Sequence, residues 1–323
     1  MRIAILDDYT DSVRGLDAFA GLSGHDVTVQ TQHIGDLDTL ADHLAGVEAI
    51  ALNRERTRIT ADLLDRLPDL RMLSNSGGYP HIDVDACTDR RVLVSSGSRQ
   101  TGPSYETAEL TWALILASAR RLPEQVAATR AGRWQTEVGT TLHGKTLGVL
   151  GYGSLGHLVA GYGRAFGLRV LVRSGEGSRR HATEDGFEVA DGQRDLFAQS
   201  DFVSVHVRLS EQTRGLVGRD DLAAMRPTAT FVNTSRAGLV EAGALEAALD
   251  SGRPGFAAVD VYDQEPVIDP HHPLLRRANV VCTPHIGYVT REGYETLFGL
   301  IIDQILAYGR GQPINVVNPA ARR

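Results

Sequence analysis

Apolar residues occur in short runs along this chain, separated by polar or helix-forming stretches. Short runs bounded by turn residues are typical of strands buried in a sheet. In the first hundred residues we expect strands at 3–6, 27–30, 47–52, 70–73 and 92–94. The spacing between them predicts helices over 37–44 and 61–67, the second with Thr60 as its N-cap. Strands alternating with helices predict a small α/β unit with a parallel sheet.

A long apolar stretch over 105–122 predicts a helix that is buried between domains or between subunits. A second alternation follows it, with strands expected at 146–150, 169–172, 202–207, 230–233, 257–261 and 280–283. Six strands joined by crossover helices, such as 242–249, predict the doubly wound sheet that binds dinucleotides. A last helix over 290–308 is expected to pack on the first unit, because chain ends often lie close together.

Composition narrows the class of protein. A length of 323 residues suggests about two domains, and the net charge of −7 argues against nucleic acid or an anionic membrane as partner. No apolar run reaches the roughly 20 residues of a membrane helix, and the N-terminus lacks a signal-peptide core. Cys87 and Cys282 form no C-x-x-C motif. We expect a cytoplasmic protein with no nucleic acid, no membrane and no metal among its partners.

Gly151, Gly153 and Gly156 form a G-x-G-x-x-G motif directly after the predicted strand 146–150. Apolar residues then recur at helical spacing. In a strand–glycine turn–helix unit, the first glycine permits the tight turn, the second lets backbone amides approach phosphate, and the third lets helix and strand pack closely. The motif therefore predicts a dinucleotide site in the middle of the chain.

A second glycine motif, over 139–146, matches the P-loop pattern G-x-x-x-x-G-K-[ST] and contains Lys145, the only lysine of the chain. A P-loop follows a strand and precedes a helix. Here a polar stretch comes before the motif and the predicted strand comes after it. We therefore do not expect a nucleoside triphosphate site.

The residues after the second strand of this unit bear on the choice of cofactor. NAD-binding units have an acidic residue about 20 positions after the glycine motif, which holds the ribose hydroxyls. Here the strand ends in Arg173 and Ser174, which suit a 2′-phosphate. The sequence favours NADP, while Glu176 keeps NAD open as the alternative.

Three residues with catalytic potential each follow a predicted strand of the central unit: Arg236, Glu265 and His285. Ligands of open α/β sheets bind outside the carboxyl ends of the strands. There, Arg236 can hold a carboxylate, His285 can exchange a hydroxyl proton, and Glu265 can hold the imidazole and favour its protonated form. Together they suit hydride-transfer chemistry.

At this point the chain resembles the D-isomer-specific 2-hydroxyacid dehydrogenases over nearly its whole length. The resemblance rests on the glycine motif, the Arg236 segment, the run 260–266 and Pro284–His285, together with 108–110 and 143–146. It implies a Rossmann-type doubly wound sheet at 101–288, inserted into a flavodoxin-like α/β substrate domain made of 1–100 and 289–323. It also implies a homodimer, formed through the helix from Tyr105 and the Trp134 segment.

The resemblance assigns roles to residues. Arg236 binds the carboxylate of a 2-oxo or 2-hydroxy acid, His285 is the acid/base, and Glu265 supports His285. Backbone amides of Gly77 and Gly78 help to bind the same carboxylate. Further positions that match cofactor-binding positions of the family are Leu155 and Gly156 at the pyrophosphate, and Val207, Thr234, Asp260 and Gly287 along the adenosine and nicotinamide.

Departures and alternatives remain open. Ser174 replaces the usual Asp of the family, and the run 79–81 departs from the usual substrate loop. Arg54 and Arg56 follow a strand of the first unit. They would either suit a second anionic group on the substrate or belong to a solvated loop. The same three catalytic residues also fit phosphite-type oxidation, or a non-catalytic NAD(P) sensor like the dehydrogenase-derived corepressors. Glu265 argues against formate oxidation, because formate dehydrogenases carry Gln there.

Overall fold

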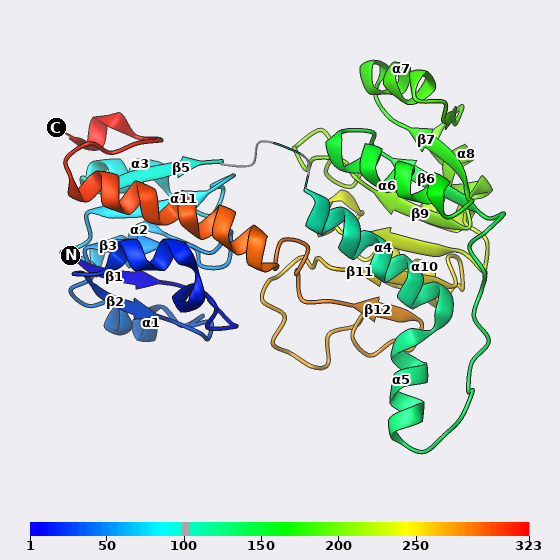
Figure 1. Ribbon diagram of the computed structural model, residues 1–323, viewed down its shortest axis with the longest axis horizontal. Helices are drawn as coiled ribbons and strands as arrows, with labels where there is room; N and C mark the ends of the chain where they lie inside the picture. Colours follow the sequence, from blue (N-terminus) through cyan, green and yellow to red (C-terminus); the bar gives the residue numbers. More distant parts are fainter. Residues whose placement is uncertain (99–101, 103, 323) are drawn as a thin grey trace. The chain divides into compact units, whose positions relative to one another are not determined.

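The computed structural model describes residues 1–98, 102 and 104–322. The chain divides into two compact units: unit 1 is Met1–Thr101 with Val289–Arg323, and unit 2 is Gly102–Tyr288 (Figure 1). The predicted boundary between residues 100 and 101 lies outside the described residues. Unit 1 therefore contains both ends of the chain, and unit 2 is inserted between them.

Unit 1 holds a parallel sheet whose described strands follow the order β2-β1-β3-β4-β5. The strands are β1 (Arg2–Ile5), β2 (Asp26–Val29), β3 (Ala49–Ala51), β4 (Met72–Ser76) and β5 (Leu93–Gly97). This is the flavodoxin-like order, whose switch point lies between β1 and β3. The fold class expected for this unit is confirmed.

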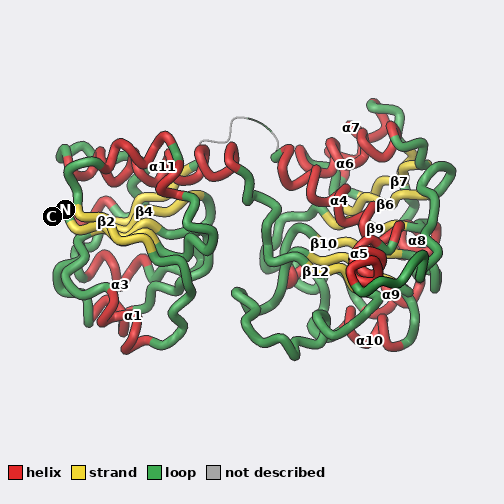
Figure 2. The backbone as a smooth tube through the Cα atoms, turned by 60° about the horizontal axis from the view of Figure 1, so that its bottom comes forward, coloured by secondary structure: helices red, strands yellow, loops and turns green. Residues whose placement is uncertain are grey.

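Helices cover both faces of this sheet, with α11 on one face and α1 and α3 on the other (Figure 2). The elements are η1 (Val13–Gly15), η2 (Asp17–Leu22), α1 (Leu37–His43), α2 (Ala61–Asp65), α3 (Val84–Asp89), α11 (Arg291–Gly309) and η4 (Pro319–Arg322). Thr60 caps α2 by accepting a hydrogen bond from the Leu63 amide at 3.3 Å, as predicted. Gln304 of α11 donates to the carbonyl of Asn75 in β4 at 3.0 Å. The last helix therefore packs on the first unit, as expected.

Unit 2 holds a larger parallel sheet, with its described strands in the order β12-β11-β10-β9-β6-β7-β8. The strands are β6 (Thr146–Leu150), β7 (Arg169–Arg173), β8 (Glu188–Val189), β9 (Phe202–Val205), β10 (Thr230–Asn233), β11 (Phe256–Val259) and β12 (Val280–Cys282). Six of them were predicted. β8 was missed because its two residues have no apolar run to mark it. The direction of the strand order reverses beside β6, as in Rossmann-type sheets.

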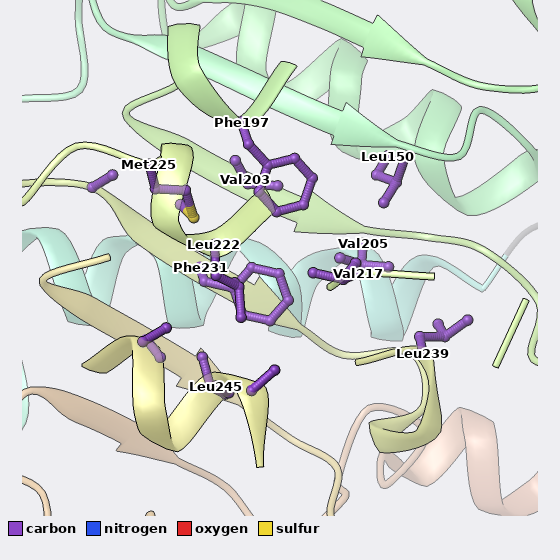
Figure 3. Close-up of a cluster of buried hydrophobic side chains, with 14 of the residues drawn as sticks. Leu150, Phe197, Val203, Val205, Val217, Leu222, Met225, Phe231, Leu239 and Leu245 are labelled. Atoms are coloured by element: carbon purple, nitrogen blue, oxygen red, sulfur yellow. The ribbon is translucent and has the colours of Figure 1, made fainter. Parts of the chain in front are cut away.

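The central strands of unit 2 are buried on both faces. Phe202 and Val232 pack in the cluster under α4 and α6, whereas Val203 and Phe231 pack in the opposite cluster, shown in Figure 3. The helices are α4 (Tyr105–Arg120), α5 (Leu122–Arg130), α6 (Ser154–Ala165), α7 (Glu176–Glu184), α8 (Gln193–Gln199), α9 (Arg219–Ala224), η3 (Ala237–Leu239) and α10 (Ala244–Asp250). This double burial explains why the strands appear as continuous apolar runs.

The stretch 105–122 forms two helices where one was predicted. Arg121 adopts a left-handed conformation with φ of 53°, so α4 ends at Arg120 and α5 begins at Leu122 as a separate helix. The apolar face of α4, including Ala108, Trp112 and Ile115, packs on the sheet and α6 of its own unit. The apolar face of α4 is therefore covered by its own sheet, and burial of this helix between domains or subunits stays a prediction.

Candidate cofactor and catalytic site

The glycine motif forms the turn between β6 and α6. Gly151 has a φ of +95°, and a Cβ added there would lie 2.5 Å from the carbonyl oxygen of His206. A Cβ on Gly156 would lie 2.1 Å from the carbonyl oxygen of Gly151. Both positions therefore exclude any side chain. Gly153 is the N-cap of α6, and Leu155 and Gly156 lie in its first turn, where backbone amides suit a pyrophosphate.

A cavity of about 390 Å³ opens over this turn. Its lining residues come from the glycine turn, the end of β7, the start of α7 and the segment after β9: Leu150, Gly151, Tyr152, Gly153, Arg173, Ser174, Gly175, Ser178, Gln193, His206, Val207 and Leu216. Because β6 and β9 are neighbours at the reversal of strand order, the cavity lies at the switch point of the sheet. The predicted residues Gly151, Gly153, Arg173, Ser174 and Val207 are brought together here, and this cradle fits a dinucleotide.

The region after β7 is polar and basic, without an acidic group in the cavity wall. Arg173 and Ser174 line the cavity, and Gly175 is the N-cap of α7. Ser178 lies in the first turn of the same helix and also lines the wall. Glu176 is exposed at the first position of α7 and is not a lining residue. The wall therefore combines a guanidinium, hydroxyls and a helix N-terminus, all of which suit an anion.

Glu265 and His285 form a close pair at the carboxyl edge of the sheet. They follow β11 and β12, and Oε2 of Glu265 lies 2.5 Å from Nδ1 of His285. The other carboxylate oxygen accepts from the Tyr262 amide at 2.9 Å, which fixes the carboxylate. Each side chain is 16% exposed. Because a carboxylate only accepts, Nδ1 carries the proton of this hydrogen bond, and Nε2 is the ring atom that can exchange protons.

Asp260 is fully buried and holds the segment that carries His285. Its carboxylate accepts from the Thr283 hydroxyl at 2.6 Å and from the amides of Ile286 and Gly287 at 2.9 Å each. Burial raises the pKa of this carboxyl, and these hydrogen bonds oppose the rise. Asp260 and Gly287, predicted separately as cofactor-lining residues, are therefore in direct contact. His285 itself has a φ of 53°, a conformation that a firmly held turn can maintain.

The turn after β10 presents Thr234 and Arg236. Asn233 donates to the Arg236 carbonyl at 3.0 Å, and Ser235 donates to the Val205 carbonyl at 2.8 Å. The first bond closes the turn, and the second ties it to β9. Strands β10, β11 and β12 are neighbours, so Arg236, Glu265 and His285 follow three adjacent strands at the same edge.

In unit 1, Gly77 and Gly78 follow β4 in a loop. The carbonyl of each glycine accepts a hydrogen bond from a side chain of the same unit. The Ser96 hydroxyl donates to Gly77 O at 2.8 Å, and the side-chain amide of Asn75 donates to Gly78 O at 3.0 Å. The Gly77 amide donates to Gly97 O at 2.7 Å. Within the described residues the Gly78 amide has no acceptor, so it is the available donor of the two predicted.

Arg54 follows β3 and lies against this glycine loop. Its Nη1 atom is 3.6 Å from the position that a Cβ on Gly77 would take. Arg54 is partly buried with a φ of 58°, and Arg56 is buried. The interpretation of this segment as a solvated loop therefore does not hold for these two arginines.

Three further predictions concern features outside this site. The run 139–146 precedes β6, so a strand follows its lysine and no helix does, and the geometry of a P-loop is absent there. Among residues 1–98, 102 and 104–322, no group of three or more His, Cys, Asp and Glu is arranged to hold a metal ion. No helix of the described chain is long and apolar enough to cross a bilayer.

Sequence reasoning missed several residues that the structure places at the site. Thr107 and Thr111 of α4 contact Gly287 and Thr234, and His206 packs against Gly151. Thr107 and Thr111 are four residues apart, which puts them on one helix face. This spacing, next to the family-like run 108–110, was the only sign in the sequence that the two threonines belong to the site. It does not reveal which strand their helix face covers.

This arrangement defines a nicotinamide-dependent oxidoreductase: a Rossmann-type cofactor cavity and a carboxylate–histidine pair at one sheet edge. Residues 112–287 match the family model of the D-isomer specific 2-hydroxyacid dehydrogenase, NAD binding domain. The chain belongs to the D-isomer specific 2-hydroxyacid dehydrogenase family. It is an NAD(P)-dependent enzyme that transfers hydride between a 2-oxo acid and a D-2-hydroxy acid.

Individual relatives agree with this assignment. The chain is 39% identical over 273 residues to a glyoxylate reductase of Aeropyrum pernix, covering 81% of this chain and 80% of the relative. It is 35% identical over 269 residues to a D-3-phosphoglycerate dehydrogenase of Methanocaldococcus jannaschii, covering 82% of this chain but 51% of the relative, so it spans about half of that protein. A solved structure from Ralstonia solanacearum, a candidate D-3-phosphoglycerate dehydrogenase oxidoreductase, is similar with a TM-score of 0.94 and 48% identity, covering 100% of this chain and 98% of that one.

Proposed function

We propose that this enzyme works as a reductase of 2-oxo acids, with Arg236 anchoring the substrate carboxylate and His285 acting as the acid. The observation that carries the proposal is the 2.5 Å contact between Glu265 and His285 at the sheet edge that also bears the cofactor cavity. Acid/base catalysis needs a group held in one orientation. Glu265 and the turn held by Asp260 together supply that orientation.

Each residue has a distinct role in the proposed reduction. The reduced cofactor, when bound, supplies a hydride to the carbonyl carbon. Arg236 binds the carboxylate by charge-assisted hydrogen bonds. The role of Gly77 and Gly78 toward the same carboxylate stays a prediction from the family resemblance. His285 delivers the Nε2 proton to the carbonyl oxygen as negative charge develops on it. Glu265 compensates the positive charge of the doubly protonated imidazole before that transfer.

We also propose that the preferred cofactor is NADP(H). A 2′-phosphate would be stabilised by the Arg173 guanidinium, the Ser174 hydroxyl and the N-terminus of α7, all of which border the cavity. NAD would require an acidic partner for its ribose hydroxyls, and Glu176 lies outside the cavity wall. The cofactor-binding roles of Leu155, Gly156, Val207, Thr234, Asp260 and Gly287 are part of this proposal.

Arg54 supports a substrate class with a second anionic group. Its guanidinium lies against the Gly77–Gly78 loop, and a guanidinium can bind a second carboxylate or a phosphate on the substrate through two parallel hydrogen bonds. The similarity to a D-3-phosphoglycerate dehydrogenase agrees with a phosphorylated substrate. A homodimer formed through the segment that contains Trp134 completes the proposal.

The central test follows NADPH oxidation with a panel of 2-oxo acids, with and without a second anionic group. Replacing His285 with Ala should lower kcat at least about a hundredfold, because acid/base catalysis contributes that much, while the Kd for the cofactor stays nearly unchanged. His271→Ala, an exposed histidine, serves as the matched control. A His285→Ala enzyme that keeps more than about a tenth of the wild-type rate would remove His285 as the acid. Tight cofactor binding without turnover of any acid would favour the sensor.

A further inference from the structure

Tyr152, between the first two glycines of the motif, connects the glycine turn to α7. Its side chain lines the cofactor cavity and is 5% exposed. Its hydroxyl lies 2.7 Å from Oδ2 of Asp185, the C-cap residue of α7. At the other end of the same helix, Gly175 and Ser178 line the cavity as well. One hydrogen bond therefore joins the turn proposed to hold the pyrophosphate to the helix proposed to hold the 2′-phosphate.

Counting protons gives the direction of this bond. A carboxylate only accepts, so the Tyr152 hydroxyl donates to Asp185. The same phenol oxygen lies 3.0 Å from Nδ1 of His157 in α6, so it accepts from the His157 N–H. Burial raises the pKa of Tyr152, and the bond from Tyr152 is the main cause that lowers the pKa of Asp185. At neutral pH the phenol is therefore protonated and the carboxylate ionised, which are the states that this bond needs.

Helix α7 has little apolar packing of its own. Of its nine residues only Ala182 is buried, and Figure 1 shows the helix at the β7 end of the sheet of unit 2. A short helix without an apolar face is marginal by itself, so its orientation depends on bonds at its ends. At the carboxyl end, the Tyr152 bond is joined by a bond from Arg164 of α6 to the Asp185 carbonyl at 2.9 Å. The glycine turn is a firm anchor for the first bond, because Gly151 is closely packed against the segment after β9.

We propose that the Tyr152–Asp185 hydrogen bond holds α7 in the orientation that aims its N-terminal amides at a 2′-phosphate, and so sets the preference for NADP(H) over NAD(H). This inference rests on the proposed cofactor. The free N–H groups of a helix N-terminus point along the helix axis, so a tilt of α7 turns them away from the phosphate. NAD(H) has no phosphate at this position and is insensitive to the tilt. The Tyr152 hydroxyl and the Asp185 carboxylate act through α7 and are therefore positioning groups.

The test measures Kd values of NADPH and NADH by fluorescence titration of the full chain. Tyr152→Phe removes only the hydroxyl and keeps the ring, which packs edge-on against Phe187 at 5.8 Å between centroids. This variant should bind NADPH about fivefold more weakly, the equivalent of one hydrogen bond, and NADH within about twofold of the wild type. Asp185→Ala should give the same change, although the backbone bond from Arg164 remains. Asp185→Asn keeps an acceptor oxygen for the phenol and should retain the wild-type ratio of the two Kd values.

A double variant with Tyr152→Phe and Asp185→Ala should lose no more NADPH affinity than either single variant, because both remove the same bond. Tyr162→Phe is the matched control, since Tyr162 lies on α6 and does not line the cavity, and it should keep the wild-type ratio. Additive losses in the double variant, or an unchanged ratio in Tyr152→Phe, overturn the inference while a wild-type preference for NADPH leaves the cofactor proposal standing. A wild type that binds NADPH and NADH equally overturns the cofactor proposal and this inference with it.

Discussion

His206 shows how a single residue beside the cofactor cavity is affected by its surroundings. Its carbonyl packs against Gly151, and its Nε2 lies 2.8 Å from the Ser204 hydroxyl. Its Nδ1 atom is buried without a partner among the described residues. Burial lowers the pKa of the imidazole from 6.5 to about 3, so the ring stays neutral near the cofactor at physiological pH.

This lowered pKa predicts a specific loss of stability in acid. Between pH 6.5 and 3 the unfolded chain binds a proton at His206 that the folded chain rejects, so stability falls as the pH drops below 6.5. From pH 7 to pH 5 the free energy of unfolding of the wild type should fall about 1–2 kcal/mol more than that of His206→Gln. Urea titrations at both pH values measure this difference. Parallel losses in the two proteins would contradict the burial argument.

At the level of single residues, sequence reasoning named the groups that carry chemistry but not their hydrogen-bond partners. Glu265 and His285 were predicted to interact, and they do. The bonds from the Asp260 carboxylate to the His285 turn were not foreseen, because they join residues 23 to 27 positions apart. Such contacts depend on where two strands end, which the local pattern does not specify.

At the level of elements, the end of β7 and the start of α7 form the region that we propose selects the cofactor. Arg173→Ala should weaken NADPH binding about tenfold or more and leave NADH binding nearly unchanged, because only the former carries the 2′-phosphate. Fluorescence titration of both reduced cofactors gives the two Kd values. Arg180→Ala is the control, since Arg180 is exposed on α7 and does not line the cavity. Equal losses for both cofactors in Arg173→Ala would exclude the phosphate contact.

Elements with long apolar runs were predicted well, and short or polar ones were not. The two residues of β8 and the polar helix α7 lie in stretches without clear periodicity. The break between α4 and α5 was also missed, since Arg121 adopts its left-handed conformation within a run that favours helix. In each case the neighbouring structure outweighs the local preference of the sequence.

At the level of the whole molecule, α5 and the loop after it form an exposed arm, defined here as Leu122–Thr141. Trp134 is 80% and Val138 is 95% exposed, which is unusual for large apolar side chains. A second copy of the chain is the proposed partner of this surface. Light scattering coupled to size-exclusion chromatography should give a dimer mass for the wild type. A double variant with Trp134→Ser and Val138→Ser should shift toward the monomer.

The control for this experiment is Ile268→Ser, which removes an 83% exposed apolar side chain outside the arm. It should remain as dimeric as the wild type. A monomeric wild type, or a double variant with the full dimer mass, would contradict the role of the arm.

The sequence by itself determined the two α/β units, the glycine turn at Gly151 and the three residues of the proposed catalytic set. These are properties of local patterns: apolar runs, turn glycines, and polar residues directly after strands. Only the tertiary structure decided which strands are neighbours, that the Gly77 amide is already bonded, and that Thr111 of α4 lies 2.8 Å from the Thr234 hydroxyl. Those features arise where segments far apart in the chain pack together, and packing against a distant partner leaves no periodic signal in the local sequence.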